Sequence, residues 1–342
     1  MSKFKKAALS SFGAFLVLFW ICGGVFYYQA THSVSEKFHP EIVNIAPGMP
    51  LKKISTYFAE QNLIRSAISF QLLAHLQKKQ GQIQVGEYEL SPSMTPREIL
   101  AKVTSGKTVL HTVTIPEGYR ITEIAALLEE RRLANREEFI RQTQDRELIQ
   151  STGIPGNSLE GYLFPETYHF SRNTSEQKII QIMLNTFKEQ VAAPELMDRA
   201  KAVNLSFHQI VTLASLIEKE TGIDEERKII SSVFHNRLKK NMRLQTDPTV
   251  IYAISNFDGN IRKKDLSIDS PYNTYKYGGL PPGPIASPGL QSILAALAPN
   301  DTDYLYFVSR KDGSHQFSSN LIDHNRAVQK YQLRRIATRV QQ

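Results

Sequence analysis

Hydrophobic and polar positions divide the chain into an uncharged N-terminal run, a set of strand–helix patterns and a longer, mainly helical part. Residues 7–28 carry no charged side chain and are long enough to cross a bilayer as one helix. Short apolar segments at 43–48 and 113–118 each precede residues at helical spacing, and 88–95 is a partial third copy. These patterns predict a transmembrane helix followed by small strand–turn–helix units.

The strand–turn–helix units resemble the LysM fold, a small module that binds glycans containing N-acetylglucosamine. Generic α+β packing explains the same pattern, so both interpretations stay open. The boundaries predicted are a cytoplasmic tail over 1–6, a transmembrane helix over 7–28, a polar tether over 29–42 and the LysM-like subdomain over 43–106. The remainder, 107–342, forms the second folded region.

The second region is predicted to be mostly helical with a loop-rich β insert, which makes the whole chain α+β. After Asn241 the sequence is rich in Pro, Gly and Asn, which favour turns over helices or central strands. Such stiff loops often shape a cleft. The expected helices and strands cover 175–189, 206–221, a segment from Asp224, 289–298, 304–308 and 315–318.

Charge suits a membrane-anchored protein that works on an anionic surface. The formal net charge is +8, and Lys3, Lys5 and Lys6 precede the apolar run. Lysines on that side predict a cytoplasmic N-terminus and a body across the membrane. A cleaved signal peptide is the alternative, although the run is long for one. The mild basicity does not require nucleic acid, and Cys22 inside the span leaves no cysteine for disulfides or thiol chemistry.

One expected helix ends in two carboxyl groups. Ser206 is a plausible N-cap and Gly222 a plausible stop. At about 100° per residue, Glu220 falls on the apolar face with Ile217, while Glu218 points more than a quarter-turn away. Burial and the helix dipole would both raise the pKa of Glu220, as a general acid requires. The alternative is an exposed helix end without chemistry.

Several other site types are excluded by their missing motifs. The nine histidines include no HExxH pair, and the chain has no Gly-rich phosphate loop and no G-x-S-x-G elbow. No metal and no cofactor is therefore expected. Carboxylates beside polar, aromatic loops are typical of glycan-active enzymes, where aromatic rings stack on sugars.

Collinear motifs resemble the YceG-like family of membrane-anchored peptidoglycan lytic transglycosylases. They are L-E-G-Y-L-F-P-E-T-Y (159–168), L-A-S-L-I-E-K-E-T (213–221), S-V-F-H-N-R-L (232–238), M-R-L-Q-T-D-P-T-V-I-Y (242–252), Y-N-T-Y (272–275), G-L-P-P-G-P-I (279–285), Y-L-Y-F-V (304–308) and H-N (324–325). Related sequences often carry Asp at the position of Glu166. The match runs from the anchor to the C-terminus, so 107–342 is interpreted as a YceG-like catalytic domain.

The resemblance implies endolytic cleavage of the β-1,4 bond between N-acetylmuramic acid (MurNAc) and N-acetylglucosamine (GlcNAc) in nascent strands. The products would end in 1,6-anhydro-MurNAc, and cleavage would terminate strand elongation. It also implies Glu220 as the catalytic residue, an inner-membrane location with a periplasmic body, and peptidoglycan synthases as partners. Alternatives are a muramidase that uses water and a peptidoglycan-binding scaffold with a dead site.

The remaining candidates are a second acid and a set of sugar-binding residues. Glu218 is the runner-up acid, with a solvent-facing salt bridge as its alternative role. Asp247 could bind sugar, although a T-D-P triplet is commonly a turn with a local side-chain bond. His235 is expected to be structural or to line the cleft and not to act as a base, and Arg237 is expected to form an ion pair. The candidates for substrate binding are Gln245, Asp247, Tyr272, Asn273, Tyr275 and Glu166.

Overall fold

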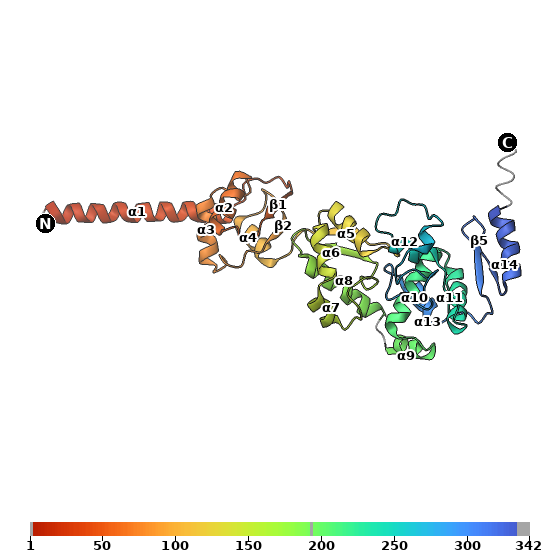
Figure 1. The fold of residues 1–342 in the computed structure, drawn as a ribbon. Helices are drawn as coiled ribbons and strands as arrows, with labels where there is room; N and C mark the ends of the chain where they lie inside the picture. The colour runs from red at the N-terminus through yellow and green to blue at the C-terminus, as the bar shows by residue number, and fades with distance from the viewer. Residues whose placement is uncertain (1–2, 192–193, 334–342) are drawn as a thin grey trace, which may run out of the picture. The chain divides into compact units, whose positions relative to one another are not determined.

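The computed structural model describes residues 3–191 and 194–333 (Figure 1). Its helices are α1 (Lys3–Thr31), α2 (Leu51–Glu60), α3 (Ala67–Leu76), α4 (Pro96–Ser105), α5 (Ile121–Glu130), α6 (Arg136–Thr143), α7 (Arg146–Thr152), α8 (Glu176–Val191), α9 (Pro194–Ala202), α10 (Phe207–Glu220), α11 (Asp224–Lys239), α12 (Asp247–Ala253), α13 (Leu290–Leu297) and α14 (Leu321–Val328). The strands are β1 (Glu41–Ile45), β2 (Gly86–Leu90), β3 (His111–Thr114), β4 (Thr167–Phe170), β5 (Tyr306–Ser309) and β6 (His315–Ser318). Two compact units result: unit 1 contains 1–111 and 169–173, and unit 2 contains 112–168 and 174–342. Mixed helix and strand content confirms the α+β expectation.

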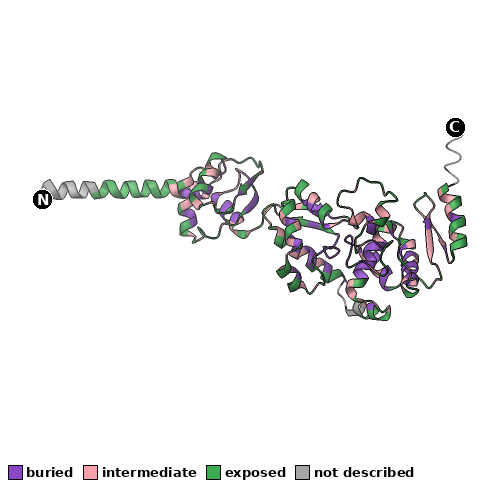
Figure 2. Ribbon diagram, in the orientation of Figure 1, coloured by how far each residue is buried: buried purple, intermediate pink, exposed green. Residues whose placement is uncertain are grey.

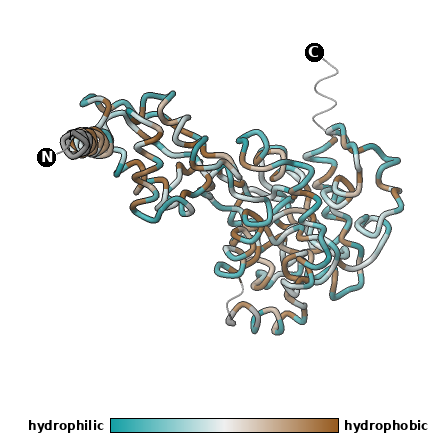
Figure 3. The backbone as a smooth tube through the Cα atoms, turned by 90° about the vertical axis from the view of Figure 1, so that its left-hand side faces the viewer, coloured by the Kyte–Doolittle hydropathy of each residue, from teal (hydrophilic) through white to brown (hydrophobic). Residues whose placement is uncertain are grey.

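The apolar run forms helix α1, which fits a single-pass membrane anchor. Residues Phe12–Thr31 are long and apolar enough to span a bilayer, with a mean hydropathy of 1.5. The helix is seen nearly end-on in Figure 3, where much of it is pale to brown. It continues to Thr31, past the point where the polar tether was expected to begin. Ala30 is buried against unit 1, and Gln29 accepts a hydrogen bond from Ser69 at 2.7 Å. The start of the expected tether is therefore part of a folded unit.

Unit 1 is a two-stranded sheet packed with helices. Strands β1 and β2 are antiparallel, with Val43 opposite Tyr88, and the buried side chains of both enter one apolar core. Helix α4 begins as the sequence predicts, because Thr95 and Glu98 form a reciprocal capping box. Helices α2 and α3 lie between the two strands in sequence, and α3 was not predicted.

The core of unit 2 surrounds helix α10. Figure 2 shows this part of the chain mainly in the colour of buried residues. Every residue of α10 from Ile210 to Leu216, and Ile217 after it, is buried, including the small polar Thr212 and Ser215. Helix α10 packs against α13, α11 and α12. The sequence predicted one buried apolar face, but residues 210–217 are buried on every side of the helix. The small side chains on the other faces allow neighbouring segments to pack closely against them.

The loop-rich part of unit 2 differs from the expected β insert. Residues 241–289, all of which are described, contain helix α12 and a 3-10 turn at Asp265–Ser267 but no strand. The T-D-P triplet predicted as a turn instead starts α12, with Thr246 as N-cap and Pro248 in the first turn. Proline is favoured there because it has no N–H to leave unsatisfied. The expected pairing of 304–308 with 315–318 is confirmed by the antiparallel β5–β6 hairpin.

Candidate active site at the end of helix α10

Helix α10 places Glu220 at its last residue. The predicted N-cap is confirmed: the Ser206 hydroxyl accepts the Gln209 N–H, and the Gln209 side chain accepts the Ser206 N–H. At the other end the helix stops just before Gly222, as expected, and Thr221, with extended backbone, is the C-cap. Both ends therefore fix which turn of the helix carries Glu220.

The carboxyl group of Glu220 is half-buried and receives a hydrogen bond from the Thr246 hydroxyl. Thr246 itself is buried and held by Thr274, whose hydroxyl accepts the Thr246 N–H at 3.1 Å. The hydroxyls of Thr274 and Thr249 lie 2.9 Å apart. A network of three threonines thus orients the donor that meets Glu220, and this donor was missed by sequence reasoning because Thr246 lies 26 residues away.

The surroundings of Glu220 give it the proton affinity of a general acid. Burial raises the pKa of Glu220 to about 7, and the charge of Asp247 raises it further. The Thr246 hydroxyl, His315 and Arg237 act in the opposite direction. A carboxylic acid with a pKa near the working pH is protonated often enough to donate and acidic enough to do so readily.

Glu218 has a different environment, in which it is fully engaged. Its Oε1 lies 3.4 Å from Nη2 of Arg227, and both side chains are only 7% exposed. Its Oε2 accepts the N–H of Gly289 at 3.0 Å, at the start of α13. The salt bridge expected as the alternative role is present, but it is buried and not solvent-facing, because the face of α10 that carries Glu218 is packed as well.

Asp247 and Tyr275 lie on the same side as Thr246. The Tyr275 hydroxyl donates to the Asp247 carboxylate at 2.5 Å, and the Asp247 side chain is exposed. The charges of both Asp247 and Glu220 contribute to a raised pKa of Tyr275, after its burial. Gln245 is exposed in a left-handed backbone conformation, with φ of 48°. The Asp247 carboxylate and the Tyr275 hydroxyl therefore lie near Glu220. Gln245 precedes Asp247 by two residues in the sequence.

Asn273 and Glu166 have local structural contacts. Asn273 is completely buried, and its amide donates to the carbonyls of Leu266 and Ile268 at 3.0 and 2.8 Å. It thus closes the loop that carries Tyr275. Glu166 is exposed just before β4, where it accepts the N–H of Thr167.

Tyr272 lies in a separate aromatic cluster. Its ring is 4.8 Å from that of Tyr252 on α12, and the charge of Glu160 acts on both hydroxyls. Burial raises the pKa of Glu160 to about 7, although its Oε1 accepts the N–H of Ile121 at 3.1 Å. Within the described residues, no three His, Cys, Asp or Glu side chains gather as metal ligands would.

Arg237 and His315 complete the charged environment of Glu220. Arg237 was expected in an ion pair, but its guanidinium donates to the carbonyls of Leu305 and Leu244, at 2.7 and 2.6 Å, and lies over the ring of Tyr306. The imidazole of His315 is 2.7 Å from Glu226 on α11. Sequence reasoning could not find Leu305 and Glu226 as partners, because they lie 68 and 89 residues from Arg237 and His315. His235, as expected, is structural: its Nε2 is 2.9 Å from the carbonyl of Ala296.

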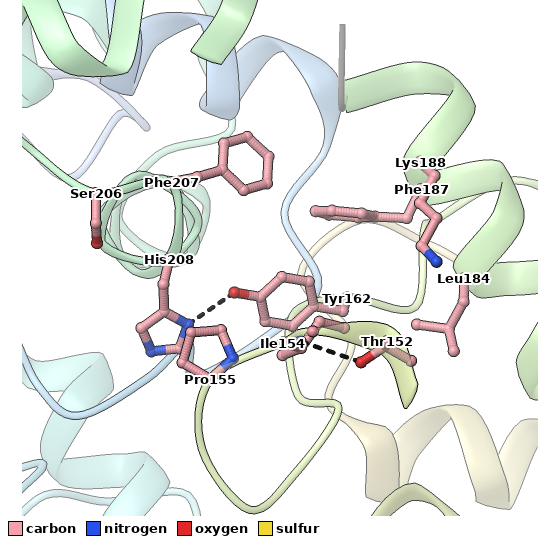
Figure 4. A pocket seen from close by; sticks show the side chains of 11 residues that line it. Thr152, Ile154, Pro155, Tyr162, Leu184, Phe187, Lys188, Ser206, Phe207 and His208 are labelled. Carbon is pink, nitrogen blue, oxygen red and sulfur yellow. Dashed lines mark hydrogen bonds between the residues drawn. The ribbon is translucent and has the colours of Figure 1, made fainter. Parts of the chain in front are cut away.

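An apolar pocket at the opposite end of α10 is separate from this site. It has a volume of about 370 Å³ and is lined by side chains that include Phe187, Phe207 and Leu184. Figure 4 shows His208 bonded there to the hydroxyl of Tyr162, at 2.7 Å. At 1.5 Å rise per residue, Phe207 and Glu220 are roughly 20 Å apart along the helix. This pocket is therefore too far from Glu220 to belong to the same site.

Comparisons with known proteins agree on one family. Residues 43–330 match the model of the YceG-like family. The "Endolytic murein transglycosylase" of Bacillus subtilis (strain 168) is 38% identical over 330 residues, which cover 91% of each chain. The protein of the same name from Streptococcus pneumoniae serotype 2 (strain D39 / NCTC 7466) is 32% identical over 94% of this chain, which spans 65% of that relative's length.

A solved structure shows the same fold. The crystal structure of a yceG-like protein from Listeria monocytogenes superposes with a TM-score of 0.58 and 36% sequence identity. The match covers 85% of this chain and all of that one. Both the sequence and the fold comparisons therefore extend over most of the chain.

Proposed function

The chain belongs to the YceG-like family, and from this premise we propose that it is an endolytic murein transglycosylase with Glu220 as its catalytic acid and base. The observation that carries the assignment of the acid is the environment of Glu220. Its carboxyl group is half-buried at the end of α10, has a pKa raised to about 7 and accepts a hydrogen bond from the Thr246 hydroxyl. No other carboxyl group in the family motif L-I-E-K-E-T combines these features, since Glu218 is neutralised by Arg227.

The reaction needs only one such group. Protonated Glu220 donates its proton to the glycosidic oxygen, which stays on C4 of GlcNAc as a hydroxyl while its bond to C1 of MurNAc breaks. The C6 hydroxyl of the same MurNAc then attacks C1, and its proton passes to the Glu220 carboxylate. The product is 1,6-anhydro-MurNAc, no water is consumed, and Glu220 regains its starting state. Intramolecular attack has a large effective concentration, which removes the need for a second carboxylate to activate water.

Asp247 and Tyr275 are proposed to contact the sugar beside the cleaved bond. The exposed Asp247 carboxylate lies close enough to Glu220 to raise its pKa, so it can also stabilise the positive charge that develops at C1. The hydroxyl of Tyr275 holds that carboxylate in place. Gln245, Tyr272 and Asn273 are proposed as more distant contributors to the binding loops, and Glu166 as a contributor to the fold of its segment.

Product analysis tests this function. Uncrosslinked glycan strands are incubated with the full chain in detergent, and the fragments are examined by mass spectrometry. Internal cleavage with 1,6-anhydro-MurNAc ends is expected. Reducing MurNAc ends would instead indicate a muramidase that uses water, and binding without cleavage would indicate a scaffold.

The rate should depend on pH in a direction that the pKa of Glu220 sets. Because the acid must be protonated in the free enzyme, kcat/KM is expected to fall about tenfold per pH unit above about 7. The measurement is the initial rate of anhydro-end formation between pH 5 and 9. An unchanged rate up to pH 9 would contradict a role for Glu220 as the acid.

Several finer features belong to the same proposal. The N-terminus is proposed to be cytoplasmic, α1 to lie in the inner membrane and the body to be periplasmic, as Lys3, Lys5 and Lys6 suggest. Residues 43–106 are proposed as the LysM-like subdomain, supported by the β1–β2 sheet and its helices, and 107–342 as the catalytic domain. The chain is proposed to act on nascent strands beside peptidoglycan synthases, ending strand elongation. Mapping cross-links from the full chain in membranes would identify such partners.

A further inference from the structure

A second cavity, in unit 2, is lined by residues that directly adjoin Glu220 and Asp247 in the sequence. Its volume is about 460 Å³, within the range of small-ligand sites, and its lining comes from the start of α5, the end of α10 and α12. Lys219, which lines it, directly precedes Glu220, and Pro248 directly follows Asp247. A group that occupies this cavity would therefore belong to the part of the substrate nearest the cleaved bond.

Two cations in the cavity lack a carboxylate partner. Lys219 donates one hydrogen bond from Nζ, to the carbonyl of Gly118 at 3.1 Å, and two of its N–H groups remain. The guanidinium of Arg120 lies 5.1 Å from the ring centroid of Tyr252, which orients it. Over residues 3–191 and 194–333, neither side chain forms an ion pair with Asp or Glu. An anion with one or two acceptor oxygens could accept hydrogen bonds from both cations.

The acidic groups near the cavity are already engaged. Glu123 also lines it, but its Oε2 accepts the N–H of Arg120 at 2.8 Å, at the start of α5. The charge of Arg120 lowers the pKa of Glu160, but Glu160 is buried and accepts the backbone N–H of Ile121. The charged side chains that line the cavity are therefore two cations and one carboxylate, which favours an anionic occupant.

The rest of the lining is apolar. Ile251, Phe257 and Ile285 form a wall that could contact methyl groups but not hydroxyl groups. A neutral N-acetyl sugar has no charge that could pair with the two cations, and it would cover only part of this apolar wall. A short peptide that carries a carboxylate and small apolar side chains would use both.

We propose that this cavity binds the acidic stem peptide of the MurNAc residue at the cleaved bond, with Lys219 and Arg120 pairing with a stem carboxylate. The inference rests on the proposed function and names the part of the substrate that the enzyme reads. The stem is attached at C3 of the sugar whose C1 is attacked, so binding it helps to place C1 beside Glu220. A charge-assisted hydrogen bond of this kind is worth about tenfold or more in affinity.

The test compares two forms of one substrate with the full chain in detergent. Uncrosslinked strands with free stem carboxylates are measured beside the same strands after carbodiimide coupling to ammonia, which converts the carboxylates to carboxamides. For the wild-type chain, kcat/KM for anhydro-end formation is expected to be about tenfold higher on the carboxylate form. Lys219→Met should bring this ratio close to one, and Lys219→Arg should preserve it.

A matched control separates the site from general charge. Lys228 is exposed on α11 and does not line the cavity, so Lys228→Met removes the same charge and should keep the tenfold ratio. Wild-type cleavage with a ratio near one, or a ratio that Lys219→Met leaves unchanged, would overturn the subsite alone. A wild-type chain that forms no anhydro ends on either strand would overturn the proposed function and the subsite with it.

Discussion

Glu220→Gln is expected to lower kcat/KM for strand cleavage about 10³-fold, within the range that general acid–base catalysis contributes. The amide cannot give a proton to the leaving oxygen and cannot take one from the C6 hydroxyl, so both halves of the reaction are lost. The measurement is the rate of formation of 1,6-anhydro-MurNAc ends on uncrosslinked strands.

Glu218→Gln is the matched control, since it makes the same change two residues earlier on the same helix. We expect it to reduce the rate by less than about tenfold, because Glu218 binds Arg227 and Gly289 and not substrate. Equal losses in the two variants would show that helix packing, not acid chemistry, explains the effect. Loss in Glu218→Gln alone would transfer the role of acid to Glu218.

The thermal stability of Glu220→Gln gives an independent check that the variant is folded. The pKa of Glu220 is about 7 in the folded chain and near the ordinary value of 4.5 in the unfolded chain. The folded state therefore binds more protons between these values, and wild-type stability falls as the pH rises through that window. Glutamine removes this dependence, so the variant should be at least as stable as the wild type at pH 8.

Arg227→Met is expected to cost about 3–5 kcal/mol of stability at neutral pH, since it leaves the Glu218 carboxylate buried without its counter-ion. Arg227 also donates from Nε to the Ser292 hydroxyl at 3.1 Å and bonds to Asp224, so it joins α10, α11 and α13. For a unit of this size the loss corresponds to a melting temperature lower by roughly 10 °C, measurable by circular dichroism.

The double variant Arg227→Met with Glu218→Gln tests the cause. Removing the unpaired charge should restore part of the stability lost in Arg227→Met. A double variant less stable than Arg227→Met would show that the Arg227 contacts to Ser292 and Asp224, not the buried charge, dominate.

Features of the site that arise between residues close in sequence could be predicted from the sequence. The Ser206 cap, the length of α10 and the place of Glu220 in its last turn follow from capping and periodicity within a few residues. The uncharged run of α1, the Thr95–Glu98 capping box and the β5–β6 hairpin follow in the same way. Helix α12 was missed because Pro248, a breaker inside a helix, is favoured in its first turn.

By itself, then, the sequence determined the membrane helix, the α+β class, the family resemblance and Glu220 as the candidate acid. Only the tertiary structure decided that Thr246 faces Glu220, that Arg227 neutralises Glu218, and that Lys219 and Arg120 share a cavity. The reason is physical. Helix caps and periodicity arise between residues close in sequence, whereas desolvation and charge pairing depend on which distant segments the packed core brings to the end of α10.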